Sequence, residues 1–358
     1  MKSWSWVLLI ISSILVKWAS LYPGWVERYY TYGLYPLVSK FQRHLFGWIP
    51  FSIGDLFYLF LIMVILFRAF RFFRLLYQKK ITRKYFAKGL QQAIFFVLFV
   101  YVSFNLLWGL NYNRTGIAPQ LGLEVKSYSL GELDTLTTVL QSRLNAYAVL
   151  VTEDGRDALD RKSSLFTQSD SAFDVARRDF PFLAYHPKSV KPSLFSYLGN
   201  YLGFQGYYNP FSGEAQVNTT VPRFLEPFVT THEIAHQLGY AKENEANFVA
   251  FLACRSYPST EFRYSMYFDM YNYAIGELRR RDTALARSFQ LKLHPQVVKD
   301  IREFRDFHKK YKNPIEPVIT WGYGHYLKAN NQPAGKQTYN EVVGWLVAYY
   351  RKFGVDAL

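Results

Sequence analysis

The sequence has very little cysteine and, over its first third, very little acidic charge. Cys254 is the single cysteine among 358 residues, which excludes an intrachain disulfide framework and any zinc site built from cysteines. A metal site would therefore have to use histidine and carboxylate ligands. Residues 1–112 carry two acidic side chains against 13 Lys and Arg, a net charge of +11, so most of the overall +15 comes from this region.

Long runs with almost no charge lie in the same region. Residues 48–67 contain one charged side chain, Asp55, and residues 89–110 contain none, so each run is long enough to cross a bilayer. A shorter apolar run at about residues 4–20 is interpreted as a first span or as the apolar part of a signal peptide. We therefore expect a membrane region over residues 1–112 with three transmembrane helices; buried core helices are the alternative.

Eight basic residues lie between Arg68 and Lys88, directly between two of the expected spans. Basic residues beside a span mark the cytoplasmic side of a membrane, which explains them better than binding to nucleic acid does. We therefore expect a multi-pass protein of the inner (cytoplasmic) membrane, with the lipid bilayer and not nucleic acid as a partner. Residues 113–358 should then form an extracytoplasmic domain.

Residues 113–358 have the composition of a folded, mainly α (α+β) domain. Ser129 and Glu132 match a capping box at the start of a helix, and helical periodicity dominates from Val221 to the end. The run Glu214 to Asn218 is interpreted as an edge strand or hairpin arm, the small β element of the fold. The polar stretch Glu153 to Asp170 is expected to be a surface connection.

Residues 232–236 follow the pattern H-E-x-x-H. His232 and His236 are four residues apart, so on a helix both imidazoles lie on one face and can bind the same ion. Glu233 lies beside that face and can contact a metal-bound water without being a ligand. The pattern therefore predicts a metal site on an amphipathic helix.

The same segment also has a structural interpretation. Thr230 to Glu233 matches a capping box, in which Glu233 would only hydrogen-bond the backbone at a helix start. However, Gly239 is suited to end this helix, and a second helix begins within a few residues, near Glu243. The second helix can bring a carboxylate beside the histidines, which favours the metal site.

Glu243 and Glu245 compete for the third ligand position. Two residues apart on one helix, they point in roughly opposite directions. Glu245 shares its face with the apolar residues Phe248, Val249 and Leu252, which we expect to pack toward the histidine helix. We therefore expect Glu245 to be the ligand and Glu243 to face solvent as a first-turn acid, although the choice between them stays open.

Three further stretches carry a resemblance to known proteins: Gly206 to Glu214, His232 to Phe248 and Tyr326 to Asn330. Together with the N-terminal apolar segments, they resemble the bacterial membrane family DUF3810. His232 to Phe248 also looks like the zinc-binding helix pair of gluzincin-type metallopeptidases, with Glu245 at the third-ligand position. The interval between the second histidine and Glu245 is shorter here than in the usual gluzincins.

The resemblance implies a zincin-like metallopeptidase domain that binds Zn²⁺ through His232, His236 and Glu245 and hydrolyses a peptide or protein substrate. A zinc ion held by three protein ligands keeps a position for water, and Glu233 would act as the general base. Tyr323 and His325 are candidate donors to the developing oxyanion. The alternative is a non-enzymatic, membrane-tethered binding or sensory domain with a structural zinc site.

Overall fold

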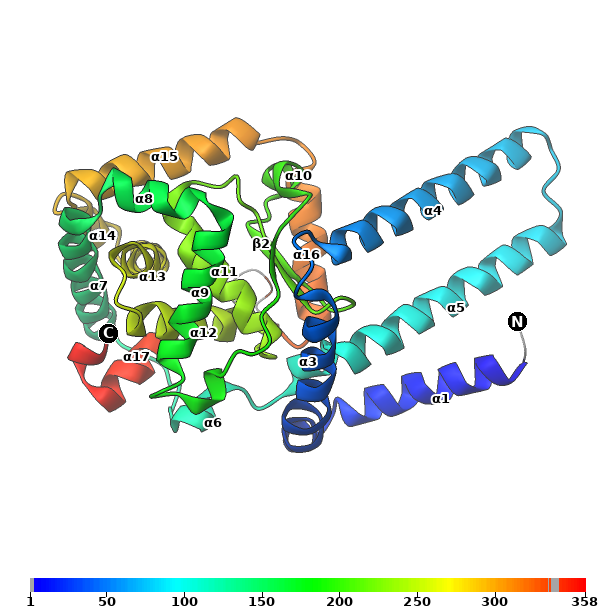
Figure 1. Ribbon diagram of the computed structural model, residues 1–358, viewed down its shortest axis with the longest axis horizontal. Helices are drawn as coiled ribbons and strands as arrows, with labels where there is room; N and C mark the ends of the chain where they lie inside the picture. The colour runs from blue at the N-terminus through cyan, green and yellow to red at the C-terminus, as the bar shows by residue number, and fades with distance from the viewer. Residues whose placement is uncertain (1–2, 334, 336–340) are drawn as a thin grey trace.

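A computed structural model describes residues 3–333, 335 and 341–358 of the chain. It is mainly helical, as expected, and Figure 1 shows a helical body with three long helices that project side by side from one end of it. The projecting helices are α1 (Ser3–Ala19), α4 (Ile53–Tyr77) and α5 (Arg83–Leu107). At the base of the projection lie α2 (Pro23–Trp25), the π-helix η1 (Val26–Leu34) and α3 (Tyr35–Phe46).

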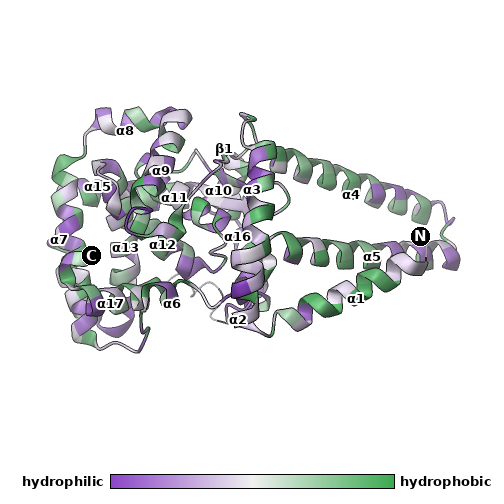
Figure 2. Ribbon diagram, turned by 60° about the horizontal axis from the view of Figure 1, so that its bottom comes forward, coloured by the Kyte–Doolittle hydropathy of each residue, from purple (hydrophilic) through white to green (hydrophobic). Residues whose placement is uncertain are grey.

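Among the described residues, α4 and α5 are long and apolar enough to cross a membrane. Each has 25 residues, which is about 37 Å of helix and exceeds the roughly 30 Å of bilayer hydrocarbon. Large apolar side chains are exposed along both helices, and Figure 2 shows the hydrophobic colouring on this part of the chain. The helix α1 and the segment Pro23–Phe46 pass the same test only as a pair bent by 102°, so the structure offers two spans, or three if this pair counts as one.

The expected spans at 48–67 and 89–110 overlap α4 and α5, but both helices extend further into the basic segment. Ser52 caps α4 by accepting a hydrogen bond from the backbone N–H of Asp55, and Thr82 caps α5 in the same way. Within the basic segment from Arg68 to Lys88, only residues 78–82 lie outside these helices. Lys and Arg are good helix formers, so their charge does not end a helix as Pro or Gly would.

The body is built from helices of very different length around a short sheet. Its helices are η2 (Gly109–Asn113), α6 (Ile117–Leu121), α7 (Leu130–Leu150), α8 (Glu153–Asp160), α9 (Lys162–Ala176), η3 (Pro181–Leu183), α10 (Ser196–Leu202), η4 (Arg223–Leu225), α11 (Glu226–Gln237), α12 (Glu243–Ser256), α13 (Thr260–Arg281), α14 (Thr283–Gln290), α15 (Pro295–Tyr311), α16 (Glu316–Ala329), α17 (Val342–Phe353) and η6 (Val355–Ala357). The helices α11 and α12 lie at its centre, and all residues of 226–237 and 243–254 are buried. The expected boundary between residues 112 and 113 falls within η2 and stays a prediction.

The capping box at Ser129 is confirmed, because Ser129 and Glu132 exchange both hydrogen bonds at the start of α7. The expectation of a surface connection over Glu153 to Asp170 is wrong, since this stretch forms α8 and the first part of α9. Its polar composition is misleading because Arg156 is buried in an ion pair with Asp300, whose Oδ2 lies 2.6 Å from the guanidinium. Charge that is paired inside the fold has the same sequence signature as charge that faces water.

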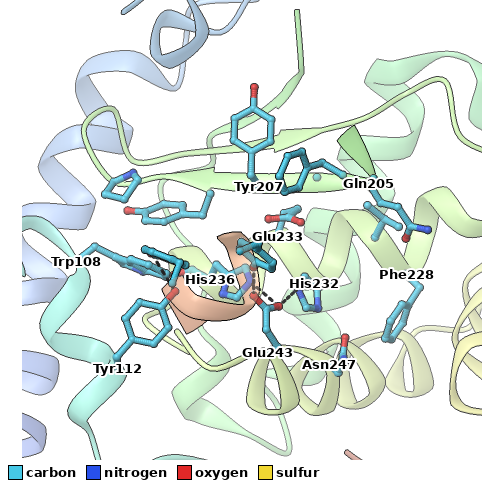
Figure 3. A pocket seen from close by; sticks show the side chains of 18 of the residues that line it. Trp108, Tyr112, Gln205, Tyr207, Phe228, His232, Glu233, His236, Glu243 and Asn247 are labelled. Carbon is cyan, nitrogen blue, oxygen red and sulfur yellow. Dashed lines mark hydrogen bonds and ion pairs between the residues drawn. The ribbon is translucent and has the colours of Figure 1, made fainter. Parts of the chain in front are cut away.

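The sheet has three short strands in the order β1 (Val190–Pro192), β3 (Glu214–Val217), β2 (Gly206–Asn209). The central strand β3 pairs parallel with β1 and antiparallel with β2, with Tyr208 opposite Ala215. Of the two alternatives expected for Glu214 to Asn218, the hairpin arm is confirmed and the edge strand is not, because β3 is the central strand. The edge strands are β1 and β2, and β2 faces the helix that carries the H-E-x-x-H pattern (Figure 3).

Candidate metal centre

The helix α11 presents His232 and His236 on one face. It begins at Glu226, one full turn before Thr230, so Glu233 is not at the helix start and the capping-box interpretation is wrong. The Thr230 hydroxyl instead donates to the carbonyl of Glu226 (2.6 Å), a bond typical of a helix interior. Gly239, with φ of +87°, ends the helix as the sequence predicted.

Glu243, at the first position of α12, lies directly opposite the two histidines. Its Oε2 is 3.2 Å from Nε2 of His232 and 3.6 Å from Nε2 of His236. Figure 3 shows the three side chains converging on one point, and all three are buried. Two imidazole nitrogens and one carboxylate oxygen, all within 4.8 Å of one another, form a group that can hold a metal ion.

Neighbouring side chains hold this group in place. Nδ1 of His236 lies 2.8 Å from the carbonyl oxygen of Tyr240; this nitrogen therefore donates, which leaves the Nε2 lone pair for a ligand. Trp108 donates from its indole N–H to the carbonyl of His236 (2.9 Å). On the other side of the site, the Tyr323 hydroxyl donates to Oε1 of Glu243 (2.7 Å), which leaves Oε2 directed at the histidines.

Burial and mutual contact shift the pKa values of these groups. Burial opposes the ionisation of Glu243, but the contacts with His232 and His236 outweigh it and hold the pKa of Glu243 well below its usual range. Burial also opposes protonation of His236, yet the neighbouring Glu243 raises the pKa of His236 to about 9. For His232, burial dominates and lowers the pKa. The carboxylate therefore stays ionised and favours positive charge between the rings.

Glu233 points from α11 toward the strand β2 and is buried between them (Figure 3). Burial, as the largest influence, raises its pKa to about 8, and its Oε2 has no hydrogen-bond partner among the described residues. Gly206 at the start of β2 gives it room, because a Cβ there would lie 2.5 Å from Oε1 of Glu233. Glu233 is thus a buried carboxyl group next to the histidines and the edge strand β2, and its Oε2 lacks a partner among the described residues.

The structure brings Glu243, and not the expected Glu245, to the two histidines. Glu245 points to another part of the body, where its Oε1 is 3.8 Å from Lys242 Nζ and packs against Gly116 so closely that a Cβ there would lie 2.1 Å away. The apolar stripe on α12 was the basis for choosing Glu245. Because α12 is buried on every side from Glu243 to Cys254, an apolar stripe does not identify the face that meets α11.

The two candidate oxyanion donors have different positions. Tyr323 lines the cavity above Glu243. His325 lies two residues further along α16, is exposed, and its Nδ1 is 2.9 Å from the backbone carbonyl of Trp321. It is absent from the residues that line the cavity, so the structure does not bring His325 to the site.

The histidines and Glu233 open into a cavity of about 590 Å³. Its wall is rich in aromatic side chains, and none of the described residues that line it is Lys or Arg. Asp269 and Tyr273, one turn apart on α13, also line it and were not found from the sequence, because neither belongs to a recognisable motif. Asp269 Oδ2 is buried without a hydrogen-bond partner among the described residues, and burial raises the pKa of Asp269 to about 8.

A family model described as a protein of unknown function, DUF3810, matches residues 30–347. The chain belongs to the DUF3810 family. The matched span of this DUF3810 protein contains α4, α5, the sheet and the whole His232, His236 and Glu243 group. No curated protein and no solved structure matches the chain.

Proposed function

We propose that this protein is a membrane-anchored, zinc-dependent metallopeptidase that hydrolyses peptide bonds through a metal-activated water. The observation that carries the proposal is the buried His232, His236 and Glu243 group, with Glu233 beside it, whose Oε2 has no hydrogen-bond partner in the described part of the chain. Three ligands from the chain leave a position for water, which distinguishes catalytic zinc sites from closed structural ones. A cavity of about 590 Å³ next to the site is large enough for part of a peptide.

The donor set fits zinc. Nitrogen from imidazole and oxygen from carboxylate are its usual ligands when cysteine is absent. Oε2 of Glu243 is buried and accepts no hydrogen bond from a described residue, although it lies within 3.6 Å of both imidazoles. A cation bound by both rings and this oxygen would satisfy it. When bound, zinc would lower the pKa of its water and polarise the scissile carbonyl group.

Glu233 is the candidate general base and acid. A carboxyl group with a pKa raised to about 8 has a proton affinity that suits proton transfer near neutral pH. It would take the proton of the attacking water and pass it to the leaving amine. Gly206 keeps the space beside Glu233 open, and the free edge of β2 can align an extended peptide by strand addition.

We assign Tyr323 to orient Glu243, because its hydroxyl already donates to Oε1 of that carboxylate. Stabilisation of the substrate oxyanion, the role that the sequence suggests for Tyr323, would require this hydroxyl to leave Glu243. The exposed position of His325 gives no support to a role in the reaction. The proposed site residues are therefore Glu233 as general base and acid, and His232, His236 and Glu243 as metal ligands.

The proposed location is the cytoplasmic membrane, with α4 and α5 as spans and the body outside. The turn between these helices, at the far tip of the projection in Figure 1, carries Lys79 and Lys80, and further basic residues continue along both helices. Basic residues at that tip favour a cytoplasmic position for it. The metal site, at the opposite end of the helices, would then be extracytoplasmic.

The test uses the full-length protein purified in detergent. We expect it to contain about one zinc ion per chain and to cleave members of a broad peptide library. Glu233→Gln keeps the shape and hydrogen-bonding capacity of the side chain, so we expect retained zinc and retained fold with hydrolysis reduced about 10²-fold or more. Zinc without hydrolysis by the unaltered protein, or equal rates for the two proteins, would favour the binding or sensory alternative.

A further inference from the structure

One face of the segment at the base of the membrane helices is apolar and exposed. Leu34, Leu37, Phe41 and Leu45 follow a helical spacing of three or four residues, and their exposed fractions are 46%, 68%, 67% and 48%. Trp48 continues the row with 79% exposed. A soluble surface rarely shows such a contiguous apolar row, which instead marks a site of interaction.

The position of this row points to the bilayer as its partner. The segment Pro23–Phe46 is bent by 102° from α1, so α3 runs across the direction of the projecting helices at their base (Figure 1). If α4 and α5 cross the membrane, α3 lies close to the plane of its surface. This is the orientation of an interfacial amphipathic helix, whose apolar face enters the boundary between headgroups and acyl chains.

Exposed aromatic side chains flank the apolar row at the base of the projecting helices. They begin at the end of α1 and continue through η1 to Trp48, and aromatic residues of this kind concentrate at membrane interfaces. These residues are Trp18, Tyr22, Trp25, Tyr29, Tyr32 and Trp48, each at least 42% exposed. Exposed Arg28 and Lys40 on the same segment can contact lipid phosphates.

The opposite face of α3 is buried and holds the metal-binding helix. The Tyr35 hydroxyl donates to the carbonyl of Gln237 (2.7 Å), and the Ser39 hydroxyl donates to the same oxygen (3.2 Å). Gln42 donates from its side-chain amide to the carbonyl of Pro210, in the turn after β2 (2.8 Å). Because Gln237 directly follows His236, one helix thickness, about 10 Å, separates the ligand helix from the apolar face of α3.

The cavity itself reaches the membrane helices. Its lining includes Tyr58 from the first part of α4, Phe104 from the last turn of α5, and Trp108 directly after it. Phe211, which also lines the cavity, packs against Tyr58 with ring centroids 6.5 Å apart. One end of the cavity is thus formed by the ends of the two candidate spans.

We propose that α3 and its flanking aromatic residues lie in the headgroup layer, and that the cavity takes a polypeptide segment anchored in the same bilayer. The second part rests on the proposed peptidase function. A chain that leaves the membrane beside α4 and α5 reaches the aromatic end of the cavity first and the metal site beyond it. The scissile bond would lie about 10–20 Å from the bilayer surface, the thickness of one or two packed helices.

The depth of α3 is tested without any peptidase activity. Phe41→Cys is labelled with an environment-sensitive fluorophore in the full-length protein and reconstituted into phosphatidylethanolamine and phosphatidylglycerol vesicles that contain a nitroxide-labelled lipid. Leu291→Cys is the matched control, because Leu291 is 88% exposed and follows α14 at the far end of the body. The native Cys254 is fully buried and its thiol pKa is raised to about 12, so it should stay unlabelled.

We expect the nitroxide lipid to quench the label at residue 41 about twofold or more and to leave the label at residue 291 unchanged. Equal quenching at the two positions would overturn the placement of α3. This result does not depend on the proposed reaction. Failure of the membrane placement and failure of the proposed peptidase function are therefore distinguishable.

The substrate class is tested in the same vesicles with one cleavable peptide from the library, presented in three forms. The first form is free, the second is attached to a lipid through a short Gly/Ser spacer, and the third through about 20 prolines, which hold it roughly 60 Å away. We expect the short-spacer form to be cleaved about tenfold faster than the proline form at equal surface density. Equal rates for all three forms would overturn the membrane-anchored substrate while leaving the peptidase function intact.

Discussion

The sharpest test of the metal site compares two glutamates on one helix. Glu243→Gln and Glu245→Gln make the same chemical change two residues apart in α12, and both positions are buried. The structure places Oε2 of Glu243 3.2 Å from His232, whereas Glu245 faces Lys242. We therefore expect the first substitution to weaken zinc binding strongly and the second to leave it nearly unchanged.

The magnitude follows from the number of ligands. Structural zinc sites in small peptides bind with about 10–16 kcal/mol from four ligands, so one ligand corresponds to roughly 3 kcal/mol. Loss of that contribution raises the dissociation constant about 10²-fold or more. An amide oxygen in place of Glu243 also lacks the charge that favours a cation between His232 and His236. Glu245→Gln removes a carboxylate that no described histidine contacts, so we expect a change of less than about threefold.

Zinc content is measured by atomic emission on the purified full-length proteins, and affinity by competition with a chromophoric chelator. Far-ultraviolet circular dichroism controls for folding, since both side chains are buried. The reasoning is refuted if Glu245→Gln loses zinc while Glu243→Gln keeps it, with both proteins folded. That outcome would restore the assignment expected from the sequence.

Three further predictions concern stability and topology. Burial raises the pKa of Asp269 to about 8, above its unfolded value of about 4, so this carboxyl group should destabilise the fold increasingly as pH rises between these values. Asp269→Asn should therefore raise the thermal midpoint at pH 8 but not at pH 4.5. An equal shift at the two pH values would contradict the buried-acid explanation. Asp300→Ala leaves Arg156 buried without its bidentate partner, and we expect the free energy of unfolding, measured with denaturant, to fall by about 3–5 kcal/mol. A loss below about 1 kcal/mol would show that the pair is not buried. Reporter fusions after Leu358 should be active only with a reporter that functions outside the cytoplasm, and cytoplasmic activity would reverse the topology.

The features predicted well from the sequence are local ones. The capping box at Ser129, the glycine stop at Gly239 and the apolar runs of α4 and α5 each depend on a few neighbouring residues, and all of these elements are present. The stretch from Glu153 to Asp170 shows where local reasoning fails. Its charges include Arg156, whose partner Asp300 lies 144 residues away, so only the tertiary fold shows that the segment is a packed helix.

The third member of the candidate metal group could not be chosen from the sequence for a related reason. The spacing of Glu243 and Glu245 shows that they point apart, but the face of α12 that meets α11 depends on how the two helices pack. The sequence favoured the carboxylate on the apolar side of α12, because the apolar side of a helix with one solvent-exposed face packs against its neighbours. Here α12 has no solvent-exposed face between Glu243 and Cys254. Tyr323 from α16 covers the first-turn Glu243, which would otherwise face solvent.

The contacts around His236 connect the proposed chemistry to the proposed membrane segment. Backbone carbonyl groups at the end of α11 usually lack helical partners, and here Trp108, Tyr35 and Ser39 supply the donors for His236 and Gln237. All three donors come from the segments around the base of the projecting helices. A shift of those segments relative to the body would therefore break hydrogen bonds at the second histidine before it altered His232, which lies one turn further inside the body. If α3 and α5 are held by the bilayer as proposed, the membrane would in this way fix the position of one proposed metal ligand as well as the route of the proposed substrate.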